Sequence, residues 1–290
     1  MRLPELLETA SVTSATAIEF GPVFFPPALR WSTVWRTAEG HDWAQTARDH
    51  EAFYVRITGF ADFRITPATI HVSANATARE STIRHLLLDQ VLPLALAAHG
   101  HLVLHASAVY REDAGIVALA GPAGAGKSTL AAALLREGWR VVSDDGLLVE
   151  ARDGRVCAIP AYAGLRMCAD AAEATGLTES AVSEVAEYSA KVRVTLPHLA
   201  SPAILKAAYV IETGEQCRIE PLGLRDGAMA LIAHAYRAEP ESRALNTAQL
   251  AACAAAVAQV PVSRLILPRD LARLPVAARA LSAHATFAAR

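Results

Sequence analysis

The sequence predicts a mixed α/β domain preceded by a smaller strand-rich region, and two patterns support this prediction. From residue 99 onward, short apolar runs typical of strands alternate with helical segments around a glycine-rich loop. Before that point, short runs of β-branched and aromatic residues are separated by turn residues and end in one helical segment. We therefore divide the chain into an N-terminal region, 1–98, and an α/β domain, 99–290.

The N-terminal region contains predicted strands at 52–57, 60–65 and 69–72. Apolar residues at helical spacing then predict a helix over 80–96. Pro93 is expected to bend or end this helix, because proline lacks the backbone N–H that the helix needs.

The α/β domain should begin with two strands, followed by a helix and a further strand. The expected elements are strands at 101–110, 115–120 and 140–142, a helix at 128–136, a hairpin of 147–150 with 155–159, a strand pair of 202–212 with 216–221, and helices at 226–237, 247–260 and 275–286. This order favours an α/β or mixed-sheet domain.

Composition excludes several classes of function. Hydrophobic residues make up 53% of the 290 residues and the net charge is −2, so the chain lacks the basic character of a nucleic-acid-binding protein. Its apolar stretches fall short of the roughly 20 residues that a membrane span needs. The first ten residues contain acidic side chains and no apolar core of a signal peptide. We expect a cytoplasmic protein without a membrane partner.

The glycine-rich loop 121–128 matches the P-loop pattern G-x-x-x-x-G-K-[ST] at every fixed position. An apolar strand precedes it and a helix follows, as the pattern requires. Successive backbone N–H groups and the helix N-terminus attract a phosphate chain. The expected ligand is ATP with Mg²⁺, held by Gly121, Pro122, Ala123, Gly124, Ala125, Gly126, Lys127, Ser128 and Thr129. In this arrangement Lys127 reaches the β- and γ-phosphates and the Ser128 hydroxyl faces the metal.

Asp144 and Asp145 end the strand that follows the P-loop helix. Ligands of open α/β sheets bind at the carboxyl ends of strands, so these aspartates should face the phosphate loop. One carboxylate could hold Mg²⁺ together with Ser128, and the other could take a proton from an attacking hydroxyl. The alternative is a solvated Asp-Asp-Gly turn that opens a hairpin.

Segments 104–109, 121–128 and 138–145 resemble the HPr kinase/phosphorylase group of P-loop kinases. Together with 86–93, they look closest to the HPr-kinase-related proteins found with lasso peptide biosynthesis, which phosphorylate a serine of a ribosomally made precursor. The resemblance implies a P-loop kinase core of HPr kinase type with a mixed sheet. It also raises the expectation of a homo-oligomer.

The resemblance implies roles for individual residues. Asp145 would be the general base and Asp144 the carboxylate on the metal side, although these two coupled groups could exchange roles. His105 would lie near the γ-phosphate and orient the base. Without the resemblance, a core histidine on a buried strand would be the favoured interpretation. The chain departs from HPr kinases at Thr129, where they tend to have glutamate, and in 161–166, where their glycine-rich signature is missing. These departures count against HPr as the acceptor and against the reverse phosphorylase reaction.

Basic residues supply weaker candidates for phosphate or substrate contacts. Lys191 and Arg193 alternate with apolar residues, so both point to one face of a strand, and Arg166 is a third candidate. The alternative for the pair is an exposed strand face.

Taken together, these residues predict a kinase that transfers the γ-phosphoryl group to a serine-type hydroxyl, with a peptide as the expected acceptor. Three rivals remain open: a kinase of a free small molecule, a regulatory protein that binds ATP without transferring phosphate, and, ranked last, an enzyme of the phosphoenolpyruvate carboxykinase kind. A closed pocket would favour a small-molecule acceptor, and an open groove beside Asp145 would favour a peptide.

Overall fold

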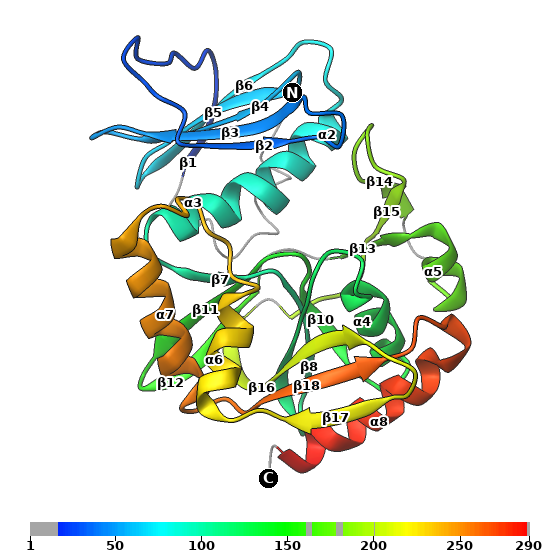
Figure 1. The fold of residues 1–290 in the computed structure, drawn as a ribbon. Coiled ribbons are helices and arrows are strands. Elements are labelled where there is room, and N and C mark those ends of the chain that lie inside the picture. Colours follow the sequence, from blue (N-terminus) through cyan, green and yellow to red (C-terminus); the bar gives the residue numbers. More distant parts are fainter. Residues whose placement is uncertain (1–16, 161–163, 178–181, 200, 289–290) are drawn as a thin grey trace.

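The computed structural model describes residues 17–160, 164–177, 182–199 and 201–288. It shows a mixed α/β protein with several sheets, which confirms the predicted class. An N-terminal sheet lies above a helical segment, and a larger sheet with helices on both faces lies below (Figure 1). In the described part of the chain, no helix is long and apolar enough to cross a membrane.

The N-terminal region forms a six-stranded sheet in the order β1-β6-β5-β4-β3-β2, antiparallel except for the pairing of β1 with β6. Alternate residues of β5 (Ala61, Phe63 and Ile65) are buried, as expected for a strand with one face on the core. That face packs on the helical segment 80–98. The strands are β1 (Ala17–Phe20), β2 (Thr33–Arg36), β3 (Asp42–Arg48), β4 (Phe53–Ile57), β5 (Ala61–Ile65) and β6 (Thr69–Ala74). The first half of this sheet, β1 to β3, was not predicted.

The helical segment is longer than predicted and contains a π-helical turn. It runs as α2 (Glu80–His85), η2 (Leu86–Val91) and α3 (Leu92–Ala98). The helix continues past Pro93, so this residue does not end it. Pro93 stands in the first turn of α3, directly after the π-helical turn, where Leu92 N–H reaches back to Leu87 C=O and the regular hydrogen-bond ladder is already displaced.

The larger sheet has nine strands, and one of them leads directly into the phosphate loop, residues 121–128. Its main path is β10-β8-β9-β16-β12-β11-β7, with β18 beside β16 and β17 beside β18. The bounds are β7 (Leu102–Leu104), β8 (Ala106–Arg111), β9 (Gly115–Ala120), β10 (Arg140–Ser143), β11 (Leu147–Arg152), β12 (Arg155–Ile159), β16 (Ala203–Thr213), β17 (Arg218–Pro221) and β18 (Val262–Leu267).

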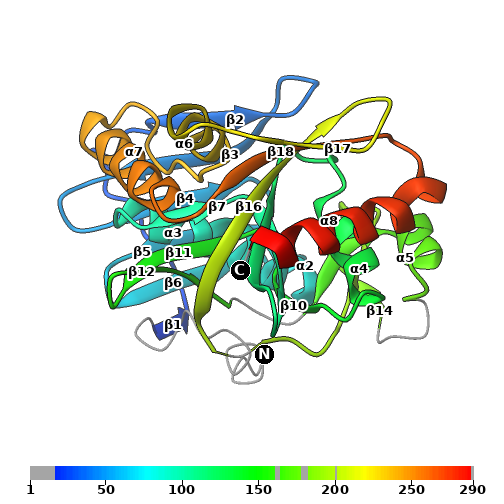
Figure 2. The same cartoon turned by 90° about the horizontal axis from the view of Figure 1, so that it is seen from below.

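Helices cover both faces of this sheet, which buries its central strands. One apolar cluster joins the sheet to α4 (Lys127–Leu135) and α8 (Leu274–Ala288), and another joins it to α6 (Leu224–Ile232) and α7 (Arg243–Val257). Figure 2 shows these two helical layers on opposite sides of β16 and β18. Helix α6 ends five residues before the predicted limit, and the chain turns there toward the N-terminal sheet. The short elements η3 (Leu271–Arg273) and α5 (Ala169–Ala174) complete the helices.

Two strand predictions are wrong. The expected single strand 101–110 is broken at His105, whose N–H donates to the His234 carbonyl at 2.7 Å instead of joining a ladder. The resulting strands β7 and β8 lie apart in the sheet. The expected pair of β16 with β17 is also absent, because the unpredicted strand β18 lies between them. Local patterns do not show a parallel neighbour that arrives from 50 residues further along the chain.

A small antiparallel sheet stands beside the phosphate loop. It consists of β13 (Leu165–Cys168), β15 (Lys191–Val194) and β14 (Val182–Glu184), in that order. Residues 161–163, part of the segment compared with the HPr kinase signature, lie outside the described residues.

Candidate functional site

The phosphate loop joins the buried strand β9 to the N-terminus of α4. Gly126 caps this helix with φ 91°, a backbone conformation that residues with a Cβ rarely adopt. A Cβ at Gly121 would lie 3.2 Å from the Ile211 carbonyl oxygen, so the loop passes closely over β16. These two glycines therefore let the chain turn tightly and present the start of α4 to a ligand.

Lys127 closes over the loop that it belongs to. Its Nζ donates to the carbonyl oxygens of Gly121 at 3.0 Å and Pro122 at 3.1 Å, and the residue is 5% exposed. Burial lowers the pKa of Lys127, although Asp145 and Asp144 oppose this effect. An anionic ligand would restore the stability of the ammonium form, so the buried lysine is suited to a phosphate group.

Ser128 and Asp144 meet at the end of the P-loop helix. The Ser128 hydroxyl lies 2.8 Å from Asp144 Oδ1 and 3.1 Å from Oδ2. Asp144 is buried and also accepts bonds from the Ser107 hydroxyl and, at 2.8 Å, from the Arg166 backbone N–H. Burial raises the pKa of Asp144, and neighbouring Asp145 adds to this while Arg166 opposes it.

This pair fits a magnesium ion. A hydroxyl and a carboxylate are the hard oxygen ligands that Mg²⁺ prefers, and a divalent cation would offset the burial of the Asp144 carboxylate. In the part of the chain that the structure describes, no group of three or more His, Cys, Asp or Glu side chains could hold a metal alone. Mg²⁺ commonly takes one or two protein ligands and completes its shell with phosphates and water. Ser128 and Asp144 are the residues that would hold it.

Asp145 adopts a strained backbone conformation at the edge of the same site. Its φ is 64°, in the left-handed region that non-glycine residues rarely occupy outside functional sites and turns. The carboxylate lies 3.7 Å from His105 Nε2 and 3.5 Å from an Arg166 guanidinium nitrogen. Burial acts to raise the pKa of Asp145, but Arg166 and His105 outweigh it and hold the pKa below its ordinary value. The side chain is therefore an anion at neutral pH.

A buried ionic network lies behind the aspartate pair and was not predicted. Asp89, in the π-helical turn η2, is 3% exposed and forms ion pairs with Arg166 and, at 3.4 Å, with Arg193. His85 also contacts its carboxylate. Burial acts to raise the pKa of Asp89, but Arg166, His85 and Arg193 outweigh it and lower the pKa. The available signal was an aspartate inside the apolar run 86–93, since an ionised group in such a run needs buried partners.

The basic candidates separate into two groups. The side chains of Arg166 and Arg193 are 1% and 3% exposed and are committed to the network around Asp89. Lys191, on the same strand as Arg193, is exposed and lines the phosphate pocket. Its charge contributes to lowering the pKa of both Asp145 and Lys127. Lys191 is therefore the basic residue placed to meet a ligand directly.

These residues enclose a pocket of about 390 Å³, called here the phosphate pocket. The structure brings most of the predicted residues to it. Of these, the lining includes His105, Ala123, Gly124, Gly126, Lys127, Ser128, Thr129, Asp145, Arg166 and Lys191. Pro122 instead faces a neighbouring groove, and Ala125 packs against the core.

Tyr236 also lines the phosphate pocket. Its hydroxyl donates to the backbone carbonyls of Asp89 at 3.2 Å and Asp145 at 3.4 Å. It therefore ties the π-helical turn to the strained aspartate. Burial raises the pKa of Tyr236 strongly, so the phenol remains a donor.

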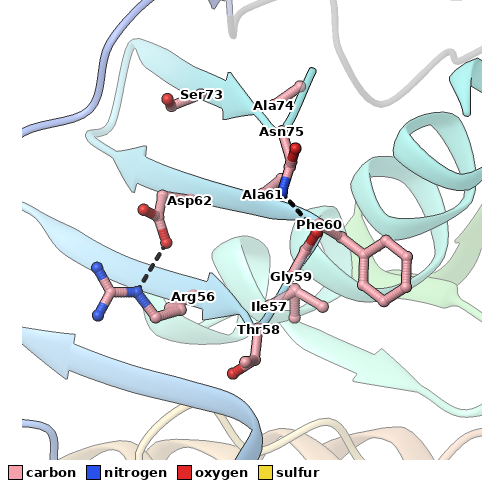
Figure 3. A pocket seen from close by; sticks show the side chains of 10 residues that line it. All are labelled: Arg56, Ile57, Thr58, Gly59, Phe60, Ala61, Asp62, Ser73, Ala74 and Asn75. Carbon is pink, nitrogen blue, oxygen red and sulfur yellow. Dashed lines mark hydrogen bonds and ion pairs between the residues drawn. The ribbon is translucent and has the colours of Figure 1, made fainter. Parts of the chain in front are cut away.

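A third hollow, of about 370 Å³, lies at the turn between β4 and β5 (Figure 3). Its charged side chains are paired with each other, since Arg56 Nε lies 2.9 Å from Asp62. Asn75 donates to the Gly59 carbonyl at 3.0 Å. Its polar groups are thus engaged within the fold, and the phosphate pocket remains the candidate site.

Comparisons with known proteins give little information about the function of this site. No protein-family model and no curated protein matches the chain. Among solved structures, the Hpr(Ser) kinase/phosphatase from Coxiella burnetii aligns with 63% of this chain and 94% of its own, at 14% sequence identity and a TM-score of 0.33. A score this low does not establish a shared fold, so the interpretation of the site depends on its own residues.

Proposed function

We propose that this protein is an ATP-dependent kinase that transfers the γ-phosphoryl group to a serine-type hydroxyl. One observation carries the proposal: the Ser128 hydroxyl and the Asp144 carboxylate meet at 2.8 Å beside a P-loop, and Asp145 follows on the same pocket. A nucleotide switch needs only the first two features. An anionic residue held in strained backbone at the pocket edge is the further part that a phosphotransferase uses.

The chain's own residues would bind and orient the triphosphate. The loop 121–128 and the start of α4 attract the phosphates, and Lys127 leaves the carbonyls of Gly121 and Pro122 to donate to them. Mg²⁺, held by Ser128 and Asp144, would supply positive charge that offsets the negative charge of the phosphates. Lys191 also lines the pocket, where it can balance charge on the transferred group.

Asp145 would direct the acceptor hydroxyl. The acceptor oxygen bonds to the γ-phosphorus while the bond between the γ-phosphorus and the β,γ-bridging oxygen breaks. The hydroxyl proton passes to the Asp145 carboxylate, and ADP departs. His105, 3.7 Å from that carboxylate, holds its orientation. The low pKa of Asp145 keeps it ready to accept a hydrogen bond, and positioning contributes much of the rate in such loose transition states.

A peptide is the acceptor class that we propose to test first. A groove of about 640 Å³ opens beside His105, which suits an extended chain better than a closed small-molecule pocket would. The resemblance in sequence to the proteins associated with lasso peptides makes a ribosomally made precursor the first example to try.

The deciding experiment is phosphotransfer measured by intact mass. The protein and magnesium-ATP are mixed with serine-containing peptides, including lasso-type precursors, and with free hydroxyl compounds such as amino acids and sugars. We expect one added phosphoryl group on a peptide with the wild type and none with Asp145→Asn. ATP binding without transfer to any acceptor would contradict the proposal and favour a regulatory nucleotide-binding protein.

A further inference from the structure

We propose that the groove between the N-terminal sheet and the phosphate loop is the acceptor site, and that it selects an acidic peptide with a large apolar side chain next to its hydroxyl residue. This inference rests on the proposed function for the transfer step. The groove itself can be tested by binding alone.

The groove is lined mainly by apolar and aromatic side chains from both parts of the molecule. The N-terminal sheet contributes one wall, and α3 and the segment after α6 contribute the other. Trp35 stands on the edge strand β2, lines the groove and is 37% exposed, so part of its ring is available to a ligand. The apolar lining includes Trp35, Trp43, Val55, Ile57, Leu94 and Pro240. A surface of this kind is suited to bury an apolar side chain of a ligand.

The groove meets the phosphate pocket at the catalytic aspartate. His105, Gln90 and Tyr236 line both cavities. Two of these residues contact Asp145, through His105 Nε2 at 3.7 Å and the Tyr236 hydroxyl at 3.4 Å. A hydroxyl bound in this part of the groove would therefore lie beside Asp145. In-line transfer further requires that it face the γ-phosphate from there.

The charge of the groove favours an acidic ligand. Its described lining contains one cationic side chain, Arg237, and no Asp or Glu side chain. Glu239 lies close in the chain, but its carboxylate is engaged by Arg48. Arg237 is exposed, and within the described residues no ion pair joins it to a carboxylate. An acidic group on the acceptor would supply the missing partner.

Two labelled peptides test the proposal by fluorescence anisotropy in the presence of a non-hydrolysable magnesium-ATP analogue. One has the sequence Gly-Ser-Phe-Leu-Glu and the other Gly-Ser-Gly-Gly-Lys. We expect the first to bind at least about tenfold more tightly, because only it buries apolar side chains and carries the acid. Trp35→Ser and Arg237→Glu should each weaken its binding about fivefold or more, the latter mainly at low salt.

Matched controls separate the groove from general effects. Phe24→Ser removes an aromatic side chain that is 78% exposed, and Arg225→Glu reverses an exposed charge on α6; neither residue lines the groove. Both should leave peptide affinity unchanged. The thermal shift caused by ATP should be the same in all four variants, which shows that they fold and keep the phosphate pocket.

The outcomes separate this inference from the proposed function. Equal affinity for the two peptides, or groove variants that behave as their controls, would overturn the inference even if phosphate is transferred. Binding that follows the groove, with no phosphoryl transfer to the bound peptide, would support the site as a peptide-binding groove and contradict the kinase.

Discussion

The phosphate loop and the ionic network around Asp89 form two sides of one pocket, but they are built in different ways. The loop uses contiguous residues, 121–128, and acts largely through its backbone and one lysine. The network joins side chains from four separate elements, α2, η2, β13 and β15, and contacts the aspartate pair through Arg166. The loop is placed to meet a ligand, and the network supports the pocket through Arg166, which contacts Asp144 and Asp145.

This difference separates the expected effects of substitution. A change in the ligand-facing side should reduce binding or transfer and leave the fold largely intact. A change in the network should destabilise the fold, because it leaves a buried charge without its partner. The network also links the helix beneath the N-terminal sheet to the P-loop side of the molecule, so its loss should affect both at once.

Asp145→Asn should give the largest effect, on the rate of transfer alone. The substitution keeps the size of the side chain and removes the anion, so kcat should fall by about 100- to 10,000-fold. The thermal shift produced by magnesium-ATP should persist, because the phosphate contacts remain. Single-turnover transfer measured by mass separates the two readouts. A rate within about threefold of the wild type would remove Asp145 from the chemistry.

Asp89→Asn should lower the free energy of unfolding by about 3–5 kcal/mol, because Arg166 and Arg193 would each lose a buried ion pair. Urea denaturation measures this change. Asp42→Asn is the matched control, since Asp42 pairs with Arg36 at the surface, where loss of an ion pair costs about 1 kcal/mol or less. Equal losses in the two variants would mean that the network contributes no more than a surface pair.

Lys127→Ala should reduce transfer by about 100- to 1,000-fold, as expected for loss of one positioned donor to the phosphates. Stability without ligand should change little, because the desolvation of Lys127 offsets its bonds to the loop carbonyls. At an ATP concentration 100 times its Kd, the wild type should gain about 2.7 kcal/mol of stability. The variant should gain clearly less at the same ATP concentration. An unchanged ATP-dependent shift would place Lys127 outside the phosphate site.

The sequence predicts the phosphate loop and the aspartate pair much better than it predicts the ionic network around Asp89. The P-loop is one contiguous segment, and Asp144 and Asp145 are another. The identity and spacing of these residues therefore predict that they lie at the ends of strands and helices that adjoin each other. Asp89 and Arg193 are 104 positions apart, and only tertiary packing brings them together. The break at His105 and the insertion of β18 also depend on partners distant in the chain. The fold class could therefore be predicted from local patterns, while the strand order and the groove could not.

The pH dependence of stability should give the smallest effect and should again distinguish the two sides. The pKa of Asp89 is lowered in the folded state, so its stabilising contribution is complete above its unfolded pKa of about 3.9. As the pH falls below 4, the unfolded state takes up the proton first, and this contribution is lost as the pH approaches the folded pKa. The raised pKa of Asp144 acts in the opposite direction.

Comparison with Asp89→Asn isolates the contribution of Asp89 from that of the other carboxylates. The wild type should lose more free energy of unfolding than the variant between pH 5 and pH 3, because only the wild type has this carboxylate to protonate. Urea denaturation across that range provides the measurement. Parallel curves for the two proteins would show that Asp89 is not held as an anion, and the network would then be a set of hydrogen bonds between neutral and cationic groups.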